Sequence, residues 1–357
     1  MPSSTSLPQS ICILRLSALG DVCNAVASVQ TIQRAFPDAK ISWVIGKLEH
    51  SLVEGLAGVE FIIFDKSEGS AGVRAFKTSM RDREFDVLLH MQVSARANRL
   101  AYIIQAKRKI GYDWNRAKEG HSFVINERIA TLSKTFPKRH VLDSFLDFAI
   151  KLGVDRDMCY PPSWDIPTTE ADREFANEII STDTQAMIIC PAASKKERCW
   201  DAQSYADIAH YVHRKQIKVI LCGGPSDLDK ELAQEIIKKT YIPVTDLTGK
   251  TSLKQLYALL GKAMFVLGPD TGPVHMANAA GTPVIGLYAH SNPARTGPYN
   301  YQDLVASVYE YHLELQTGKA IHEARWGERV QGSDLMEDIS VEQVYEIIET
   351  LLLTLSH

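Results

Sequence analysis

The sequence lacks long apolar runs and an apolar leader. Among its 357 residues, no apolar run reaches the roughly 18 residues that a membrane-spanning helix needs. The first ten residues, MPSSTSLPQS, are polar and carry neither the basic start nor the apolar core of a secretory signal. We therefore expect a protein of the cytosol that has no membrane-spanning segment.

Metal-site and cofactor patterns are also missing. The six cysteines form no C-x-x-C pair and have no histidines at zinc-site spacing, so we expect reduced thiols that are mostly buried. No G-x-G-x-x-G follows the first expected strand, and G-x-x-x-x-G-K-[ST], G-x-S-x-G and H-E-x-x-H do not occur. The missing glycine pattern argues against a nicotinamide-dependent oxidoreductase.

The net charge of -4 conceals a difference between the two halves of the chain. Residues 1–165 contain 22 Lys or Arg and 18 Asp or Glu, whereas the remaining residues contain 17 and 25. The first half is therefore the one in which we expect contacts with an anionic partner.

Short apolar runs alternate with helical patterns through the first half of the chain. Strands are expected at 11–16, 41–45, 59–64 and 85–91, and helices at 22–36 and 95–106. Such alternation predicts a parallel sheet that is covered by helices on both faces. The stretch YPPSWDIPTTEADR, residues 160–173, has three prolines and breaks the pattern, which predicts a linker.

The alternation starts again after this linker. Strands are expected at 186–190, 218–223, 264–268 and 283–288, and helices at 203–215, 228–239, 252–261, 272–280 and about 341–353. Two such halves leave a cleft, and open α/β sheets bind ligands beyond the carboxyl ends of their strands. We therefore predict a first domain over 1–165, a second over 166–335, and a C-terminal helix within 336–357 that packs back toward the first domain.

The first strand-to-helix turn carries an acidic side chain. In LRLSALGDVCNAVASVQ, residues 14–30, Asp21 stands where an apolar strand gives way to a helix. Two interpretations are open at this point. The carboxylate is either a cap of the helix or a catalytic group at the mouth of the cleft.

A second turn of this kind has the features of an anion site. In GPDTGPVHMANAAGTPVIGLY, residues 268–288, a strand ends at Gly268 and a helix begins near Thr271. The N–H groups and dipole of such a helix start can hold a phosphate, and Gly272 allows its close approach. The alternative is a capped helix start without a ligand. His275 lies on the first turn, where it either faces a ligand or packs.

The stretch CPAASKKERCW, residues 190–200, combines small residues with three cations. Lys195, Lys196 and Arg198 follow an expected strand. Such cations would neutralise the charge that develops on a leaving pyrophosphate. The alternative is a solvated basic loop, which is the commoner meaning of a charge run.

The stretch CGGPSDLD, residues 222–229, is a further strand-to-helix turn. Its two glycines allow a ligand to approach the backbone closely. Ser226 or Asp227 either caps the following helix or binds a sugar hydroxyl.

The tract 96–118 is rich in basic side chains. Its one acidic residue is Asp113, whereas its basic residues are Arg96, Arg99, Lys107, Arg108, Lys109, Arg116 and Lys118. A nucleic acid or an anionic glycolipid head group would suit such a patch. Because the whole chain is acidic and has no nucleic-acid-binding motif, we expect the glycolipid and no nucleic acid.

With SALGD at 17–21 and DTGPVH at 270–275, the sequence resembles the ADP-heptose:lipopolysaccharide heptosyltransferases, glycosyltransferase family 9. The resemblance runs from about Ile11 to the final helix. Its most specific part is D-[TS]-G-x-x-H followed by A-x-x-x-G-x-P, here 270–283. The SALGD turn looks most like that of heptosyltransferase I. The resemblance implies a GT-B fold, with two Rossmann-like, doubly wound parallel-sheet domains facing each other across a cleft.

The resemblance also implies roles for individual residues. Asp21 matches the aspartate that acts as catalytic base. The residues implied in donor binding are Lys196, Arg198, Ser226, Asp227, Asp270, Thr271, Gly272 and His275. Those assigned to the acceptor are Arg96, Arg99, Arg116 and Lys118. The chain departs from the family at 288–299, where members often have G-P-T-D-P, so the resemblance assigns no contacts to the base or sugar there.

The implied reaction is the inverting transfer of heptose from ADP-heptose to the Kdo region of lipid A. No metal or other cofactor is expected, because fixed cations and a helix start stabilise the leaving ADP. A lipid-anchored acceptor implies peripheral binding at the cytoplasmic face of the inner membrane. The alternatives are a second-heptose transferase, a GT-B enzyme for another nucleotide sugar, and a non-catalytic nucleotide-sugar-binding module. The presence of Asp21 argues against the last.

Overall fold

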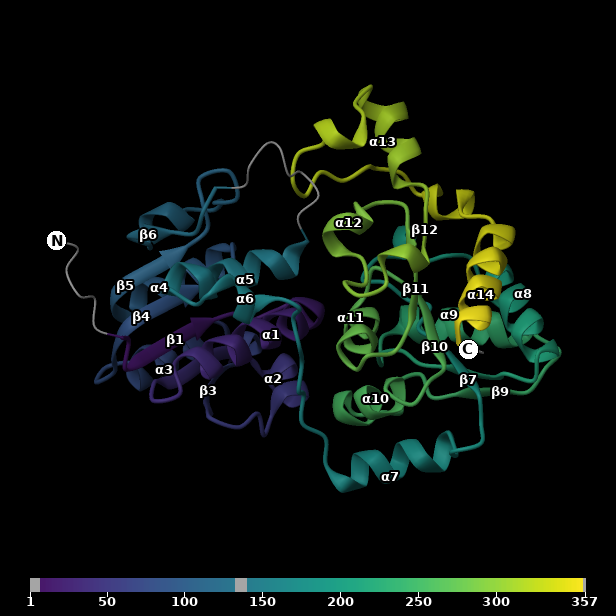
Figure 1. The fold of residues 1–357 in the computed structure, drawn as a ribbon, viewed down its shortest axis with the longest axis horizontal. Helices are drawn as coiled ribbons and strands as arrows, with labels where there is room; N and C mark the ends of the chain where they lie inside the picture. The colour runs from purple at the N-terminus through teal and green to yellow at the C-terminus, as the bar shows by residue number, and fades with distance from the viewer. Residues whose placement is uncertain (1–6, 132–139, 356–357) are drawn as a thin grey trace. The chain divides into compact units, whose positions relative to one another are not determined.

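The chain folds into two compact units, each built around its own parallel sheet (Figure 1). The computed structural model describes residues 7–131 and 140–355. The first unit holds the described residues up to Pro167 except His140, which belongs with residues 168–355 in the second. The division between the units thus falls inside the stretch 160–173 that the sequence marks as a linker.

The first unit contains a six-stranded sheet with the order β3-β2-β1-β4-β5-β6. Its strands are β1 (Ser10–Leu14), β2 (Lys40–Gly46), β3 (Val59–Phe64), β4 (Glu84–His90), β5 (Gln105–Gly111) and β6 (Glu127–Arg128). All neighbouring strands are parallel, with Ile13 of β1 beside Trp43 of β2 and Leu89 of β4. Parallel strands end at the same edge, so the turns after β1, β2 and β3 are neighbours there.

Helices cover both faces of this sheet. They are α1 (Leu19–Ala35), α2 (Lys47–Val53), α3 (Gly69–Ser79), α4 (Ala95–Ile103), α5 (Val141–Leu152) and α6 (Arg156–Cys159). One core joins Cys12 and Leu14 of β1 to Phe76 of α3 and Leu100 of α4. On another side, the long helix α1 packs against α5. The alternation of side chains along β1 thus supplies apolar contacts to both layers.

The second unit repeats the arrangement with a sheet of order β12-β11-β10-β7-β8-β9. Its strands are β7 (Ala186–Ile189), β8 (Lys218–Leu221), β9 (Val244–Asp246), β10 (Phe265–Pro269), β11 (Val284–Tyr288) and β12 (Val305–Ser307). All neighbouring strands are again parallel, and β10, β7 and β8 lie side by side within the sheet. The fold class predicted from the sequence, doubly wound parallel sheets, is confirmed.

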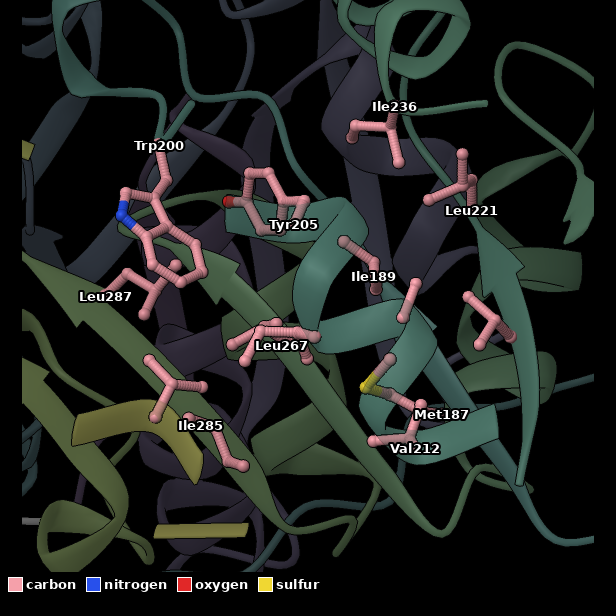
Figure 2. Packing of buried hydrophobic residues seen from close by; sticks show 14 of the residues in the cluster. Met187, Ile189, Trp200, Tyr205, Val212, Leu221, Ile236, Leu267, Ile285 and Leu287 are labelled. Atoms are coloured by element: carbon pink, nitrogen blue, oxygen red, sulfur yellow. The ribbon is translucent and has the colours of Figure 1, made fainter. Parts of the chain in front are cut away.

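The helices of the second unit enclose one large apolar core. They are α7 (Glu170–Ile179), α8 (Ala202–Arg214), α9 (Asp227–Lys239), α10 (Leu253–Leu260), α11 (Gly272–Ala279), α12 (Pro293–Thr296), α13 (Tyr309–Thr317) and α14 (Val341–Leu355). Figure 2 shows Trp200 and Tyr205 packed beside Leu267 and Leu287 of the sheet. The Trp200 indole donates to the carbonyl of Ile339 at 3.1 Å. This core fixes the loop before Trp200, which carries site residues.

The C-terminal helix is part of the core of the second unit, and its packing toward the first domain stays a prediction. Val344, Ile348 and Leu351 of α14 lie in the core of the second unit. Tyr211 of α8 donates a hydrogen bond to Glu349. The helix is held there because its apolar stripe, spaced by three or four residues, is buried against α8 and the sheet.

The strands β5, β6, β9 and β12 are not revealed by the sequence pattern. The predicted helix 95–106 ends at Ile103, and β5 begins at Gln105. The strand QAKRKIG has no apolar alternation, because Lys107 and Arg108 project from it to Asp86 and Glu127. The strands β6, β9 and β12 are two or three residues long, too short for a periodic signal.

Two smaller expectations concern thiols and membrane spans. All six cysteines are present as thiols, and five of them are buried, as predicted. Within residues 7–131 and 140–355, no helix has the length and apolar character that crossing a bilayer demands.

Candidate active site

Asp21 is not the cap of its helix. The helix α1 starts at Leu19, and Ala18, whose side chain has no acceptor, occupies the N-cap. Asp21 is the acidic residue of the first turn, and its carboxylate forms an ion pair with the guanidinium of Arg15. The Asp21 side chain is 32% exposed, so a carboxylate oxygen is accessible from outside. Of the two interpretations, the structure excludes the capping one.

Arg15 anchors the Asp21 carboxylate to the sheet. Its guanidinium also donates to the carbonyl of Met91 and lies 5.1 Å from the centre of the Phe145 ring. The Arg15 carbonyl accepts from the Trp43 indole at 3.1 Å. Arg15 is buried, so its position is fixed by the core. Arg15 is the one charged residue in the apolar stretch ICILRL, residues 11–16. This exception could have indicated a functional role, but Arg15 was not among the predicted site residues.

A pocket of about 500 Å³ lies beside the Asp21 turn, at the carboxyl ends of β1, β2 and β3. Its cationic lining residues are Lys47, Lys66 and Arg96. Its two acidic lining residues are in different environments. Asp65 forms an ion pair with Lys47 at 3.0 Å, whereas Glu49 is buried, which raises its pKa. Three cations against two acids line this hollow, which we call the basic pocket, and it lies at the sheet edge where α/β proteins bind ligands.

The basic tract does not act as one patch. Arg96, Arg99 and Lys118 are exposed, whereas Arg116 is buried. Arg116 donates to the carboxylate of Asp113 at 2.9 Å and to the Ser144 hydroxyl at 3.0 Å. This buried guanidinium stabilises the loop after β5, so Arg116 is not accessible to an acceptor, contrary to the expectation from the sequence. Removing a buried cation that is paired in this way destabilises a fold.

In the second unit, the turn after β10 forms the start of α11. Thr271 is the N-cap, Pro273 lies in the first turn, and the Thr271 hydroxyl makes no capping bond to any residue that the structure describes. The first N–H groups of a helix have no partner within it. They can therefore bind an oxyanion, and Gly272 leaves room for it. His275 is buried on this turn.

Asp270 is the centre of a polar cluster at this helix start. Its carboxylate accepts from Arg198 at 2.8 Å and from the Ser291 hydroxyl at 2.9 Å, and the His275 ring lies 3.8 Å away. Burial alone would raise the pKa of Asp270. The hydrogen bond and charge of His275, the charge of Arg198 and the Ser291 hydroxyl outweigh it and lower the pKa to about 2. Asp270 is therefore ionised near neutral pH and orients Arg198.

The loop after β7 presents its three cations differently. Arg198 is only partly exposed and faces Asp270, whereas Lys195 and Lys196 are exposed. Lys195 lies 3.3 Å from the Glu197 carboxylate. The following Trp200 is fixed in the core, so Arg198 is the cation of this loop that the fold places at the helix start of α11.

The turn after β8 contains one residue that sequence reasoning missed. Ser226 caps α9 by accepting from the Asp229 N–H, which confirms one of its two interpretations. Asp229 also accepts from the Gly224 N–H at 2.9 Å. Asp227 is exposed in the first turn. Asp227 and Asp229 both follow the two glycines, and the sequence alone does not tell which of them accepts the hydrogen bond from the Gly224 N–H.

The turns of the second unit converge because their strands are neighbours. The strands β10, β7 and β8 are adjacent and parallel, so the turns after them share one sheet edge. The structure joins Arg198, Asp270 and His275 by direct contacts and places Thr271 and Gly272 next in the chain. In the described part of the chain, no group of three His, Cys, Asp or Glu residues is arranged to hold a metal ion.

Comparisons with known proteins agree with this arrangement. The sequence profile of glycosyltransferase family 9 (heptosyltransferase) matches residues 73–323. The chain is also 40% identical to the lipopolysaccharide core heptosyltransferase OpsX of Haemophilus influenzae over 344 residues. That alignment covers 96% of this chain and 97% of the relative.

Solved structures share the fold. A glycosyl transferase of family 9 from Veillonella parvula has a TM-score of 0.79 with 24% identity, covering 97% of both chains. The E. coli heptosyltransferase WaaC with ADP has a TM-score of 0.70 with 20% identity, covering 96% of this chain and 99% of that one. At these identities the likeness establishes the architecture, which is that of the heptosyltransferases.

Proposed function

The chain belongs to glycosyltransferase family 9, the heptosyltransferases, and from this premise we propose that it transfers heptose from ADP-heptose to the inner core of lipopolysaccharide. The description of its Haemophilus influenzae relative as a core heptosyltransferase supports this class of acceptor. The observation that carries the donor assignment is the start of α11, where the ion pair of Arg198 and Asp270 lies beside the first N–H groups of the helix and the N-cap side chain makes no capping bond.

The ADP diphosphate is bound at this helix start in our proposal. Backbone N–H groups of Thr271, Gly272 and Val274 would donate to phosphate oxygens, and the helix dipole favours their charge. Arg198 supplies a fixed cation, and Lys196 supplies a mobile one at the rim. Because Asp270 holds Arg198 in place, the site is organised before the donor arrives.

Asp21 is the general base of the proposed reaction. Its carboxylate accepts the proton of the acceptor hydroxyl while that oxygen attacks the anomeric carbon of the heptose. The new glycosidic bond forms as the bond between the anomeric carbon and the β-phosphate oxygen breaks, which inverts the configuration. The electron pair leaves with ADP, where Arg198 and the α11 N–H groups stabilise the charge. Arg15 keeps the accepting carboxylate in position.

The acceptor in this proposal is the Kdo region of lipid A, and the product carries the first heptose. The SALGD turn supports this position, and the basic pocket next to it suits an anionic sugar. Arg96, Arg99 and Lys118 remain the acceptor-side cations, because all three are exposed. A lipid-anchored acceptor places the protein peripherally at the cytoplasmic face of the inner membrane.

The direct test is the transfer of heptose from ADP-heptose to Kdo-lipid A, with mass detection of the product. We expect Asp21→Asn to fold and bind ADP normally while its kcat falls by roughly 10²- to 10⁴-fold. Asp157→Asn, an exposed first-turn carboxylate of α6, is the matched control and should keep full activity. Wild-type turnover by Asp21→Asn would show that Asp21 is not the base.

Two alternatives are separated by simple assays. A second-heptose transferase would prefer an acceptor that already carries one heptose. An enzyme for another nucleotide sugar would be stabilised thermally by that sugar more than by ADP-heptose, because a bound ligand raises the melting temperature by mass action. A nucleotide-sugar-binding module would bind the donor without any turnover.

A further inference from the structure

The first unit exposes three large aromatic side chains on neighbouring segments. Tyr102 on α4 is 75% exposed, and Trp114 and Phe123 on the loop after β5 are 69% and 92% exposed. A soluble surface tolerates single exposed apolar residues, but aromatic groups gathered with cations mark an interaction site. We call Arg96, Arg99, Tyr102, Trp114, Lys118 and Phe123 the α4-loop surface.

Hydrogen bonds hold the two segments of this surface together. The Glu119 carboxylate accepts from the Ala95 N–H at the start of α4, and the Asn98 amide donates to the Glu119 carbonyl at 2.7 Å. The His121 ring contacts the Asn98 side chain at 3.2 Å. The loop therefore lies along α4 in a fixed conformation, and Phe123 projects from an ordered base.

The charge of the α4-loop surface is positive. Arg96 and Arg99 lie three residues apart on α4, which contains no acidic residue, and Lys118 lies on the loop. The guanidinium of Arg128 covers the Trp114 ring at 3.7 Å. Glu119 is an acidic residue on the same loop, and its carboxylate accepts a hydrogen bond from the Ala95 N–H at the start of α4. The segments that carry the exposed aromatic rings thus also carry exposed cations.

This combination matches the interfacial region of a bilayer. Trp and Tyr prefer the level of the lipid head groups, where one end of the ring is apolar and the other is hydrated. Lys and Arg near an anionic bilayer each add binding energy through the surface potential. A nucleic-acid surface would also be basic, but the chain is acidic overall and carries no motif for it.

Arg96 links the α4-loop surface to the basic pocket, because it also lines that pocket. We propose that the α4-loop surface docks the protein on an anionic phospholipid bilayer, with Tyr102, Trp114 and Phe123 at the head-group level. The proposal rests on the proposed function in one respect, since it explains how a lipid-anchored acceptor reaches the pocket without leaving the bilayer.

The test is cosedimentation of the full chain with vesicles, without donor or acceptor. We expect binding to vesicles of phosphatidylcholine with phosphatidylglycerol, and little binding to phosphatidylcholine alone. Phe123→Ser should weaken binding about tenfold, because burial of a Phe side chain is lost. Arg99→Glu should weaken it about as much and reduce its salt dependence. Tyr241→Ser is the matched control, because Tyr241 is 93% exposed on the second unit.

Each outcome of this assay decides the proposal. Equal binding by wild type, Phe123→Ser and Arg99→Glu would overturn it, as would wild-type binding that ignores lipid charge. Loss of self-association in Phe123→Ser without any vesicle binding would assign the surface to a second copy of the chain. Binding of RNA by wild type but not Arg99→Glu, again without vesicle binding, would assign it to nucleic acid.

Kinetics separate this proposal from the proposed function. With Kdo-lipid A in anionic vesicles, Phe123→Ser should raise the acceptor KM about tenfold with kcat unchanged. With a soluble acceptor that lacks acyl chains, the variant should match wild type. If no acceptor is turned over but vesicle binding shows the expected variant effects, the docking surface stands and the proposed reaction fails.

Discussion

Arg15 and Asp21 act as one unit at the scale of single residues. A carboxylate on a helix start is mobile unless something holds it, and here a buried guanidinium does so. The guanidinium is itself held by the Met91 carbonyl and the Phe145 ring. Arg15 is thus a positioning residue, since it acts on the proposed reaction through Asp21.

Replacing Arg15 should lower turnover without weakening donor binding. We expect Arg15→Met to reduce kcat by roughly 10- to 100-fold and to leave the Kd of ADP unchanged, because the carboxylate loses its anchor while the second unit is intact. Arg15→Lys should recover part of the loss. Arg83→Met is the control, since Arg83 pairs with Glu60 at 2.7 Å in the same unit. A rise in the Kd of ADP would contradict the assignment.

Arg198 is the residue whose loss should weaken donor binding. A charge-assisted contact is worth about 1.5–3 kcal/mol, so Arg198→Ala should raise the Kd of ADP at least about tenfold by calorimetry. Arg198→Lys keeps the charge without the planar fork, and its Kd should lie between the two. Arg173→Ala, which removes an exposed arginine paired with Glu170, should change nothing. Unchanged ADP affinity in Arg198→Ala would remove Arg198 from the donor site.

At the scale of elements, α4 is tied to the sheet by a buried histidine pair. The rings of His90, on β4, and His121 lie 4.4 Å apart, and both contact the Asn98 side chain. Burial lowers the pKa of His90 to about 3, with the His121 charge adding to the effect. Burial also lowers the pKa of His121 to about 4, and the Arg128 charge adds to it. Both rings are neutral in the folded state near neutral pH.

This pair should make the first unit sensitive to mild acid. An unfolded histidine has a pKa near 6.5, so the unfolded chain binds protons below that pH while the folded chain does not. Stability is therefore full above about pH 6.5 and falls toward pH 4, by up to about 1.4 kcal/mol per pH unit for each ring.

Urea unfolding at about pH 6.5 and about pH 5 measures this slope in a range where most carboxylates stay ionised. His121→Gln should unfold with a smaller pH slope than wild type. His322→Asn, which changes an exposed histidine, should keep the wild-type slope. Equal stability at the two pH values in wild type would contradict the neutral histidine pair.

The two units divide the proposed chemistry at the scale of the whole molecule. Asp21, Arg15 and the basic pocket belong to the first unit, whereas Arg198 and Asp270 belong to the second. Each unit has its own apolar core, so each can position its groups without the other. The proposed reaction assigns the base to the first unit and the donor contacts to the second.

Removal of divalent metal should leave the transfer rate unchanged. Asp227 and Asp229 are spaced as D-x-D, a pattern that can hold a divalent cation, but Asp229 already accepts from the Gly224 N–H and contacts Ser226. The proposed scheme uses Arg198 and the α11 start in place of a metal ion. An initial-rate assay with and without EDTA tests this, and a loss restored by Mg²⁺ would contradict it.

The sequence by itself determined the layers of the fold and the strand-to-helix turns that carry the proposed site residues. Buried parallel strands need continuous apolar runs, so β1, β7, β10 and β11 were predicted close to their observed bounds. Asp270 follows β10 directly, and Asp21 lies in the first turn of the helix that follows β1, so the strand-to-helix pattern predicts both at the edge where open α/β sheets bind ligands. The family also followed from these local patterns.

Only the tertiary structure decided the partners of charged groups. Arg116 is one more cation in the sequence, and its burial against Asp113 depends on α5, which follows much later in the chain. The pairing of Arg15 with Asp21 and of Arg198 with Asp270 likewise requires the packed sheets. Periodicity records whether a position is apolar, whereas the partner of a charge depends on distances that folding sets.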